Sequence, residues 1–192
     1  MSEQQRTSGA RLNLLLIAAV ACAPLIAAYA LFHLWRPTAF TNYGHLLPPT
    51  PIAALDAGRI EDKPFTLAAL RGKWVFLMVD SGRCAEECRD KLYKMRQVRL
   101  TQGKDMQRIE RVWLIDDDVP AAADLVNQYE GTHVVSAHGS AVLSPLPADA
   151  SVHDHIYIVD PMGNLMLRYP RGADPDRMKK DVSRLLRVSR IG

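Results

Sequence analysis

The sequence lacks the short motifs that mark several large classes of protein. It contains no zinc-finger spacing, no Walker loop and no G-x-G-x-x-G, so it does not resemble the nucleotide-binding or zinc-finger folds that carry them. Its formal net charge is only +3, which is too small to indicate nucleic acid as a partner. The composition, with 48% hydrophobic and 23% charged residues, is that of a globular chain. Its 192 residues suffice for one domain and an appendage.

Charged residues are also missing from a long stretch near the amino terminus. The run 14–35 contains none, is rich in Leu, Ile and Ala, and is long enough to cross a bilayer as a helix. Pro24 is tolerable inside such a helix. A cleaved signal peptide, cut near Ala28-Tyr29-Ala30, is the alternative, but its apolar core would be shorter. We therefore expect an uncleaved transmembrane helix over residues 14–35.

The flanks of the apolar run predict how the chain is oriented. Residues 1–13 carry Arg6 and Arg11 against the single acid Glu3, and positive residues favour the cytoplasmic side. We expect residues 1–13 in the cytoplasm and the rest of the chain beyond the inner membrane, in the periplasm. The segment 36–51 contains four prolines and predicts a stiff, extended tether. Residues 52–192 then form the domain proper.

The domain is organised around the apolar run 73–80. Its β-branched and aromatic residues predict a buried strand, which Ser81-Gly82 ends. From Arg83 the chain is charged, with apolar residues near helical spacing. Cys84 and Cys88 therefore lie where a central strand passes to the amino terminus of a helix. The unpaired N–H groups of a helix amino terminus lower the pKa of a nearby thiol.

The spacing of the two cysteines indicates what they can do. Four residues apart, Cys84 and Cys88 would lie one turn apart on the same face of a helix. Such a pair can bind one soft metal ion, Cu(I) or Zn(II), or oxidise to a disulfide. Two buried structural cysteines are the alternative. Five charged residues within 83–90 indicate that this turn is not fully buried.

The remaining pattern predicts an α/β domain with a central mixed sheet flanked by helices. We expect helices after the cysteines, at 120–129 and from Asp174 onward, and a hairpin turn at 160–164. The expected strands other than the central one are 52–55, 65–67, 109–115, 131–135, 156–159 and 165–169.

The order strand–helix–strand–helix, then a strand hairpin and a terminal helix, is that of the thioredoxin fold. Three stretches extend the likeness: 70–75 entering the central strand, the C-x-x-x-C pair, and Asp154-His155 shortly before 157–163. Over residues 52–186 the sequence resembles the Sco (SenC) family, membrane-tethered thioredoxin-like proteins of cytochrome c oxidase assembly. The resemblance implies that Cys84, Cys88 and a downstream histidine bind Cu(I) for delivery to the dinuclear copper centre of the oxidase. The implied partner is an oxidase subunit or another copper chaperone.

The chain departs from the family pattern in three places. Ala85 and Arg89 stand where the family's cysteine motif usually has prolines. His155 keeps the family's Asp-His pair but lies nearer to the Pro-x-Gly turn than the family's histidine, and His153 is closer to that spacing. The acidic segment 116–120 is only loosely like the family's loop. We therefore interpret the chain as a divergent member, with His155 as the first choice of third metal ligand and His153 as the alternative.

Three functions follow from these features. In the first, Cys84, Cys88 and a histidine hold Cu(I) in a metallochaperone. In the second, the protein is a thiol–disulfide oxidoreductase in which one cysteine attacks a partner disulfide and the other resolves it. In the third, a non-catalytic module docks on a membrane complex. We expect oxidase assembly, with the mechanism and any enzymatic activity left open between these alternatives.

Overall fold

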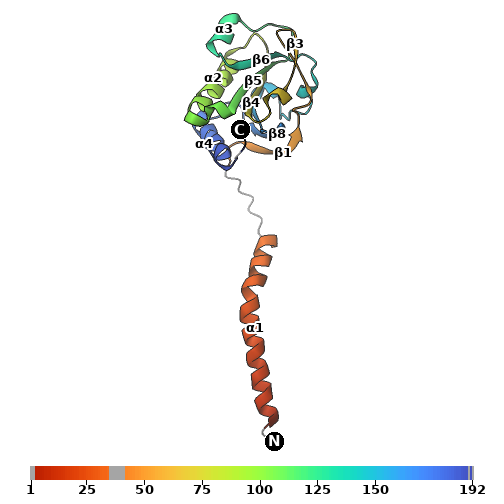
Figure 1. Ribbon diagram of the computed structural model, residues 1–192, viewed down its shortest axis with the longest axis vertical. Helices are drawn as coiled ribbons and strands as arrows, with labels where there is room; N and C mark the ends of the chain where they lie inside the picture. The colour runs from red at the N-terminus through yellow and green to blue at the C-terminus, as the bar shows by residue number, and fades with distance from the viewer. Residues whose placement is uncertain (1–2, 35–41, 190, 192) are drawn as a thin grey trace. The chain divides into compact units, whose positions relative to one another are not determined.

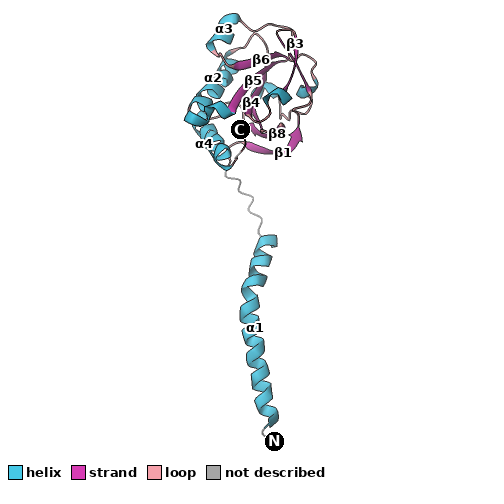
Figure 2. Cartoon of the chain, in the orientation of Figure 1, coloured by secondary structure: helices cyan, strands magenta, loops and turns pink. Residues whose placement is uncertain are grey.

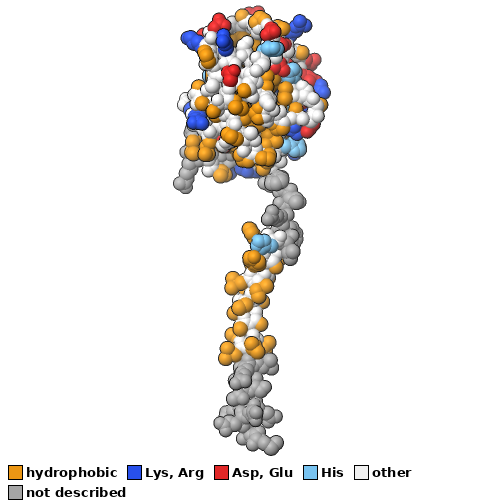
Figure 3. All heavy atoms as spheres, turned by 90° about the vertical axis from the view of Figure 1, so that its right-hand side faces the viewer, with side chains coloured by type: hydrophobic (Ala, Val, Ile, Leu, Met, Phe, Trp, Pro, Cys, Tyr) orange, Lys and Arg blue, Asp and Glu red, His pale blue; other side chains and the backbone are white. Residues whose placement is uncertain are grey.

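The computed structural model describes residues 3–34, 42–189 and 191, and the chain divides into two compact units, Met1–Thr41 and Asn42–Gly192 (Figure 1). The first unit contains helix α1, Glu3–Leu34. Its 21-residue segment Asn13–His33 is apolar and long enough to cross a bilayer, and its described side chains are mostly hydrophobic and exposed (Figure 3). Residues 35–41 lie outside the described residues. They include the predicted end of the span and the first part of the predicted tether.

The second unit is built on one mixed sheet of eight strands, in the order β1-β8-β7-β4-β5-β6-β2-β3. Strands β4, β5 and β6 run parallel to one another, and the other neighbours pair antiparallel. The strands are β1 His45–Pro51, β2 Asp56–Ile60, β3 Lys63–Thr66, β4 Trp74–Asp80, β5 Ile109–Ile115, β6 Thr132–Ser136, β7 Ile156–Val159 and β8 Asn164–Tyr169. The α-helices are α2 Glu86–Leu100, α3 Ala123–Gln128 and α4 Pro175–Val188, and α2 and α4 lie on the same side of the sheet (Figure 2). This arrangement confirms the predicted thioredoxin-like α/β class.

Strand β4 is the centre of the domain, as its apolar sequence predicts. All seven of its residues are buried, with β5 on one side and β7 on the other. Side chains alternate between the faces of a strand, so β4 contributes to two apolar clusters. One cluster packs under α2, α3 and α4 and includes both cysteines of the C-x-x-x-C pair. The other lies on the opposite face, under the β2–β3 hairpin and the loop after β6.

Part of the segment predicted as a tether belongs to the sheet. Strand β1, His45–Pro51, pairs antiparallel with β8 and forms an edge, with an irregularity between Leu46 and Thr50. Prolines lack the N–H that an inner strand must donate, and an edge strand tolerates them. Just before β1, the buried carboxylate of Asp181 on α4 accepts hydrogen bonds from the N–H groups of Tyr43 and Gly44. The compact unit therefore begins at Asn42 and not at the predicted Ile52.

Several element boundaries differ from those expected. The predicted strand 52–55 is a turn, and the hairpin forms from β2 and β3 around Glu61 and Asp62. Both residues have positive φ, as a two-residue type I′ turn requires. Helix α3 begins at Ala123, three residues after Pro120. Strand β6, predicted at 131–135, lies between β5 and β2 in the sheet.

Candidate functional site

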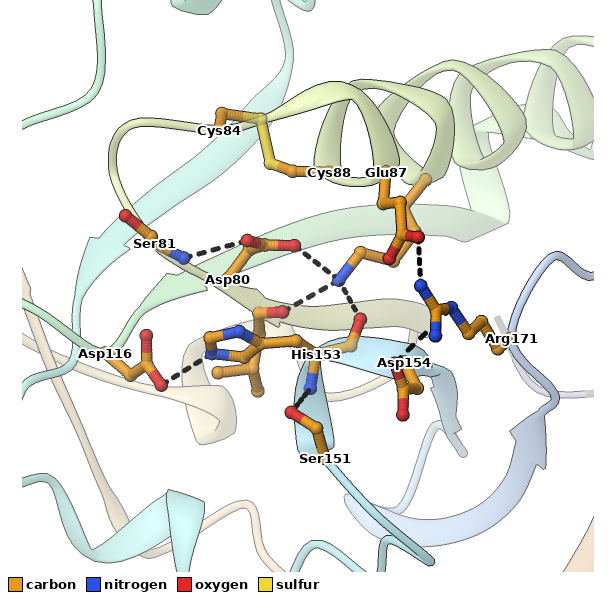
Figure 4. A network of polar contacts seen from close by, with 12 residues as sticks. Asp80, Ser81, Cys84, Glu87, Cys88, Asp116, Ser151, His153, Asp154 and Arg171 are labelled. Carbon is orange, nitrogen blue, oxygen red and sulfur yellow. Dashed lines mark hydrogen bonds and ion pairs between the residues drawn. A yellow bond between two sulfur atoms is a disulfide. The ribbon is translucent and has the colours of Figure 1, made fainter.

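The two cysteines form a disulfide at the carboxyl end of β4. Cys84 lies in the loop that follows Asp80, and Cys88 lies in the first turn of α2 (Figure 4). Their Cα atoms are 5.0 Å apart, within the range that a disulfide requires. The charged residues of this turn are exposed, as expected, but each cysteine is itself only 1% exposed. The surrounding charged side chains point outward and leave the two sulfur atoms in the apolar cluster under α2.

The loop that carries Cys84 is held by hydrogen bonds and by a close backbone approach. Its Ser81 and Gly82 N–H groups bond to the carboxylates of Asp80 and Asp117, at 3.0 and 3.1 Å. A Cβ on Gly82 would lie 1.7 Å from the carbonyl oxygen of Val119, so only glycine lets the two loops touch. The Ser81 hydroxyl, followed by the Gly82 N–H, lowers the pKa of Asp117. The loop is thus fastened to the acidic segment after β5.

The amino terminus of α2 is electrostatically suited to thiolates. The N-cap residue is Ala85, whose side chain has no acceptor atom for the first N–H groups of α2. Glu86 and Glu87 in the first turn complement the positive end of the helix dipole. The same end favours a thiolate at Cys84 or Cys88 once the disulfide is reduced.

A buried ion pair lies beneath the disulfide. Lys91 Nζ is 2.7 Å from Asp80 Oδ2, and it also donates to the carbonyl oxygens of Val79 (2.9 Å) and His153 (2.5 Å) (Figure 4). Both side chains are nearly inaccessible, at 8% exposure for Lys91 and 13% for Asp80. Burial lowers the pKa of Lys91, and the hydrogen bond to Asp80 opposes that shift. The pair joins the end of β4 to α2 and to the segment before β7.

Sequence reasoning did not identify Lys91, although a signal for it exists. Cys88, Lys91, Leu92 and Met95 have the i, i+3, i+4, i+7 spacing of a single helix face, and the structure buries all four. A lysine on an otherwise apolar face must find an acceptor or an opposite charge when that face is buried. The spacing indicates burial, but only the fold supplies the partner.

The two candidate histidines have different surroundings. His153 lies in a short 3₁₀ segment, Val152–Asp154, and its Nε2 is 2.8 Å from Asp116 Oδ2. Its side chain is 39% exposed. The other candidate, His155, is buried, and its Nδ1 is 2.9 Å from the carbonyl oxygen of Tyr169. A carbonyl only accepts, so Nδ1 donates its proton to it, and Nε2 is buried without a partner.

The disulfide and the His155 ring do not form one site in the structure. His155 directly precedes β7 and is two residues from Tyr157, so their side chains lie on the same face of the sheet. Their rings contact each other edge to face, with centroids 5.8 Å apart. Tyr157 belongs to the apolar cluster on the face away from α2, whereas both cysteines belong to the cluster under α2. Within the part of the chain that the structure describes, no group of three or more His, Cys, Asp or Glu side chains is arranged to hold a metal ion.

A charged cavity of about 100 Å³ lies beside the first turn of α2. Arg171 crosses it, in an ion pair with Glu87 and within 3.8 Å of Asp154 (Figure 4). The contact with Glu87 raises the pKa of Arg171, which stays charged in any case. Residues of α2, of the segment before β7 and of the loop after β8 therefore meet at the same end of the sheet as the disulfide. The lining residues are Glu87, Asp90, Lys91, His153, Asp154, Arg171 and Gly172.

A mixed sheet with its cysteine pair between the central strand and the following helix defines a thioredoxin-like domain. The family model for the transmembrane-like, thioredoxin-like, C-terminal domain matches residues 74–189, which is more than half of the chain. The chain therefore belongs to that family. No curated protein sequence matches it significantly.

Solved structures share the fold at low sequence identity. Apo Sco1 from Thermus thermophilus is 19% identical with a TM-score of 0.55, covering 78% of this chain and 98% of that one. Yeast Sco1 with copper bound is 13% identical with a TM-score of 0.55, covering 79% and 96%. DsbF from MTB, in mixed oxidized and reduced forms, is 21% identical with a TM-score of 0.54, covering 71% and 98%. The likeness to Sco proteins is thus shown for the fold, which a redox protein also shares.

Proposed function

We propose that this chain is a membrane-tethered thiol–disulfide exchange protein of the periplasm that acts in cytochrome c oxidase assembly. The observation that carries the proposal is the Cys84–Cys88 disulfide between the central strand β4 and the amino terminus of α2. The compartment rests on the apolar helix α1 and on the basic residues before it. The place in oxidase assembly rests on the resemblance to the Sco family in sequence and fold.

The exchange reaction reduces a disulfide of a partner protein. The Cys84 thiolate attacks one sulfur of that disulfide, forms a mixed disulfide and releases the partner's other sulfur as a thiolate. The Cys88 thiolate then attacks the Cys84 sulfur and releases the first partner sulfur. The partner gains two electrons as a dithiol, and the pair becomes the Cys84–Cys88 disulfide. A dithiol donor of the same compartment returns the pair to the reduced state.

The position of each cysteine, in the loop or in the helix, assigns its role in the proposed exchange. Cys88 is held in the first turn of α2, whereas Cys84 lies in a loop. Both are 1% exposed, so a partner reaches the sulfur atoms only when this loop opens. Opening the loop exposes Cys84 first, which makes Cys84 the attacking residue and Cys88 the resolving one.

The test is to equilibrate the full-length chain in detergent with mixtures of reduced and oxidised glutathione and to count free thiols by alkylation. We expect a two-electron transition of the pair. Cys88→Ser should accumulate a mixed disulfide between Cys84 and glutathione, Cys84→Ser should accumulate far less, and Cys22→Ser is the matched control. A pair that no dithiol reduces unless the domain unfolds would overturn the proposal, because the disulfide would then be structural.

We propose as a second function that the reduced pair accepts Cu(I) for delivery to the copper centre of the oxidase. Two thiolates whose Cα atoms are 5.0 Å apart suit a soft, low-coordinate ion. His155 is the proposed third ligand, because its Nδ1 is held by a backbone carbonyl and its Nε2 has no partner. Its ring lies with Tyr157 on the face away from α2, so the site forms only when the cysteine loop opens and brings the reduced thiols to the ring. His153 is the alternative third ligand, since its segment contacts Lys91 on α2. Yeast Sco1, which binds copper, has the same fold.

Competition for Cu(I) with a chromophoric chelator tests this second function on the reduced full-length chain. We expect His155→Ala to weaken Cu(I) binding strongly while the pair remains oxidisable. His153→Ala is measured beside it, and the exposed His138→Ala is the matched control. Equal affinity in the parent chain and in the double variant of residues 153 and 155 would exclude a site of two thiolates and an imidazole. The protein would then be a redox or docking factor.

A further inference from the structure

An apolar groove lies at the end of the domain away from the disulfide. Its volume is about 360 Å³, and it runs between the last turns of α4 and the β7–β8 hairpin. Trp74, the first residue of β4, lines it, whereas the disulfide follows the last residue of that strand. A seven-residue strand spans about 20 Å, which separates the two features. The groove is therefore a surface distinct from the thiol site.

The rim of the groove exposes large hydrophobic side chains. Met162 is 68% exposed, Val188 is 78% exposed and Ile191 is 56% exposed. Among the described residues from 42 onward, these are the most exposed large hydrophobic side chains. Arg108 donates to the carbonyl oxygens of Ser189 and Ile191, so the end of the chain is held in place at the rim.

The charge around the groove is positive. Arg184 lines it, and the exposed Arg187 lies next to Val188. The acid among the lining residues is Asp160, and its carboxylate accepts hydrogen bonds from the N–H groups of Met162 and Asn164 and from the Asn164 amide. These hydrogen bonds direct the Asp160 carboxylate toward the turn between β7 and β8. Apolar side chains beside arginines form the pattern of a surface that binds at a membrane interface.

The chain from the apolar helix enters the domain beside this groove. Asp181 of α4 binds the N–H groups of Tyr43 and Gly44, and Arg184 Nη1 donates to Asn42 Oδ1 at 3.2 Å. Asp181 is two helical turns, about 10 Å, from Val188. Helix α1 ends at Leu34, and eight residues of chain reach at most about 28 Å. The groove therefore lies on the domain next to Asn42, the first described residue after α1.

We propose that this end of the domain docks on the surface of the anionic bilayer that holds α1. Met162, Val188 and Ile191 enter the headgroup region, and the exposed Arg187 faces lipid phosphates. The disulfide, at the opposite end of β4, then faces away from the membrane toward a partner. This inference rests on α1 remaining attached to the chain and is independent of the thiol chemistry.

Site-specific photo-crosslinking tests the docking. The full-length chain carries p-benzoylphenylalanine at position 188 and is reconstituted in vesicles of equal parts phosphatidylcholine and phosphatidylglycerol. We expect phospholipid adducts at position 188 and several-fold fewer at position 93, the matched control, where Tyr93 on α2 is 53% exposed. The yield at 188 should fall several-fold with Arg187→Glu or in pure phosphatidylcholine. It should not change with Lys63→Glu, which makes the same charge change on β3.

The outcomes separate this proposal from the others. Crosslinks from position 188 to a second copy of the chain, equal lipid yields at positions 188 and 93, or release of the chain from the vesicles by alkaline wash would each overturn it. The redox state of the Cys84–Cys88 pair is measured in the same samples by alkylation. A chain that fails to dock but exchanges its disulfide normally would therefore refute only the docking.

Discussion

Cys84 adopts a left-handed backbone conformation, with φ of +42°. Residues with a Cβ rarely adopt it, and the cost is on the order of 1 kcal/mol. The conformation turns the chain so that Cys84, outside the helix, faces Cys88 inside it with 5.0 Å between their Cα atoms. A four-residue spacing thus becomes compatible with a disulfide because one residue of the pair leaves helical geometry.

Lys91 gives the first residue-scale prediction. Lys91→Met removes the partner of Asp80 and leaves its buried carboxylate without an opposite charge, which costs about 3–5 kcal/mol of unfolding free energy. Lys94→Met is the matched control: its pair with Asp90 is an i, i+4 contact with a half-exposed acid, worth about 0.5 kcal/mol or less. Urea unfolding of the oxidised protein measures both. Equal losses for the two variants would contradict the role of the buried pair.

At the scale of elements, β1 attaches the first residues of the domain to the sheet. Its pairing with β8 covers an edge that would otherwise expose unpaired backbone groups. The N–H groups of Tyr43 and Gly44 add a second attachment, to the buried carboxylate of Asp181. Residues 43–51 are therefore held to the rest of the domain by both the sheet and α4.

Truncation tests this attachment. A chain beginning at Ile52 lacks β1 and leaves Asp181 buried without its donors, whereas a chain beginning at Asn42 keeps both. We expect the shorter chain to lose at least about 2 kcal/mol of unfolding free energy relative to the longer one, since each orphaned buried group costs about 1–3 kcal/mol. Thermal and urea unfolding compare the two. Equal stabilities would mean that 42–51 is a free tether, as its prolines alone suggest.

At the scale of the whole molecule, the apolar helix and the disulfide both bear on the cellular compartment of the domain. Disulfides persist outside the cytoplasm and are rare within it. A helix with basic residues before it leaves its carboxyl-terminal side outside. Both features support the proposal that the thioredoxin-like domain lies outside the cytoplasm, where it could exchange thiols with secreted or membrane proteins.

The topology itself is testable in cells. A reporter that is active only outside the cytoplasm, fused after Gly192, should be active, and the full-length protein should remain in membranes after alkaline wash. A reporter that is active only in the cytoplasm when fused at the same position is the control and should be silent. The reverse pattern would contradict the orientation. Release of an active domain by alkaline wash would instead identify α1 as a cleaved signal peptide.

Local pattern by itself determined the apolar helix, the central strand and the position of the cysteine pair. A strand that is buried on both faces needs a continuous apolar run, and residues 74–79 of β4 form one. The change to helical spacing after Gly82 places the cysteines at the start of α2. The hairpin between β7 and β8 follows from Pro161 and Gly163 at its turn. These features depend on neighbours in sequence, so sequence periodicity reports them.

Only the tertiary structure decided which distant residues meet. Lys91 pairs with Asp80, and Asp181 binds the residues before β1, because packing brings separate elements together and burial obliges their polar groups to find partners. The two histidines, two residues apart in sequence, differ for the same reason. His153 remains half-exposed beside Asp116, while β8 covers His155 and supplies the carbonyl that sets its tautomer. A sequence pattern shows which residue types are available, but the pairing of strands and helices selects their contacts.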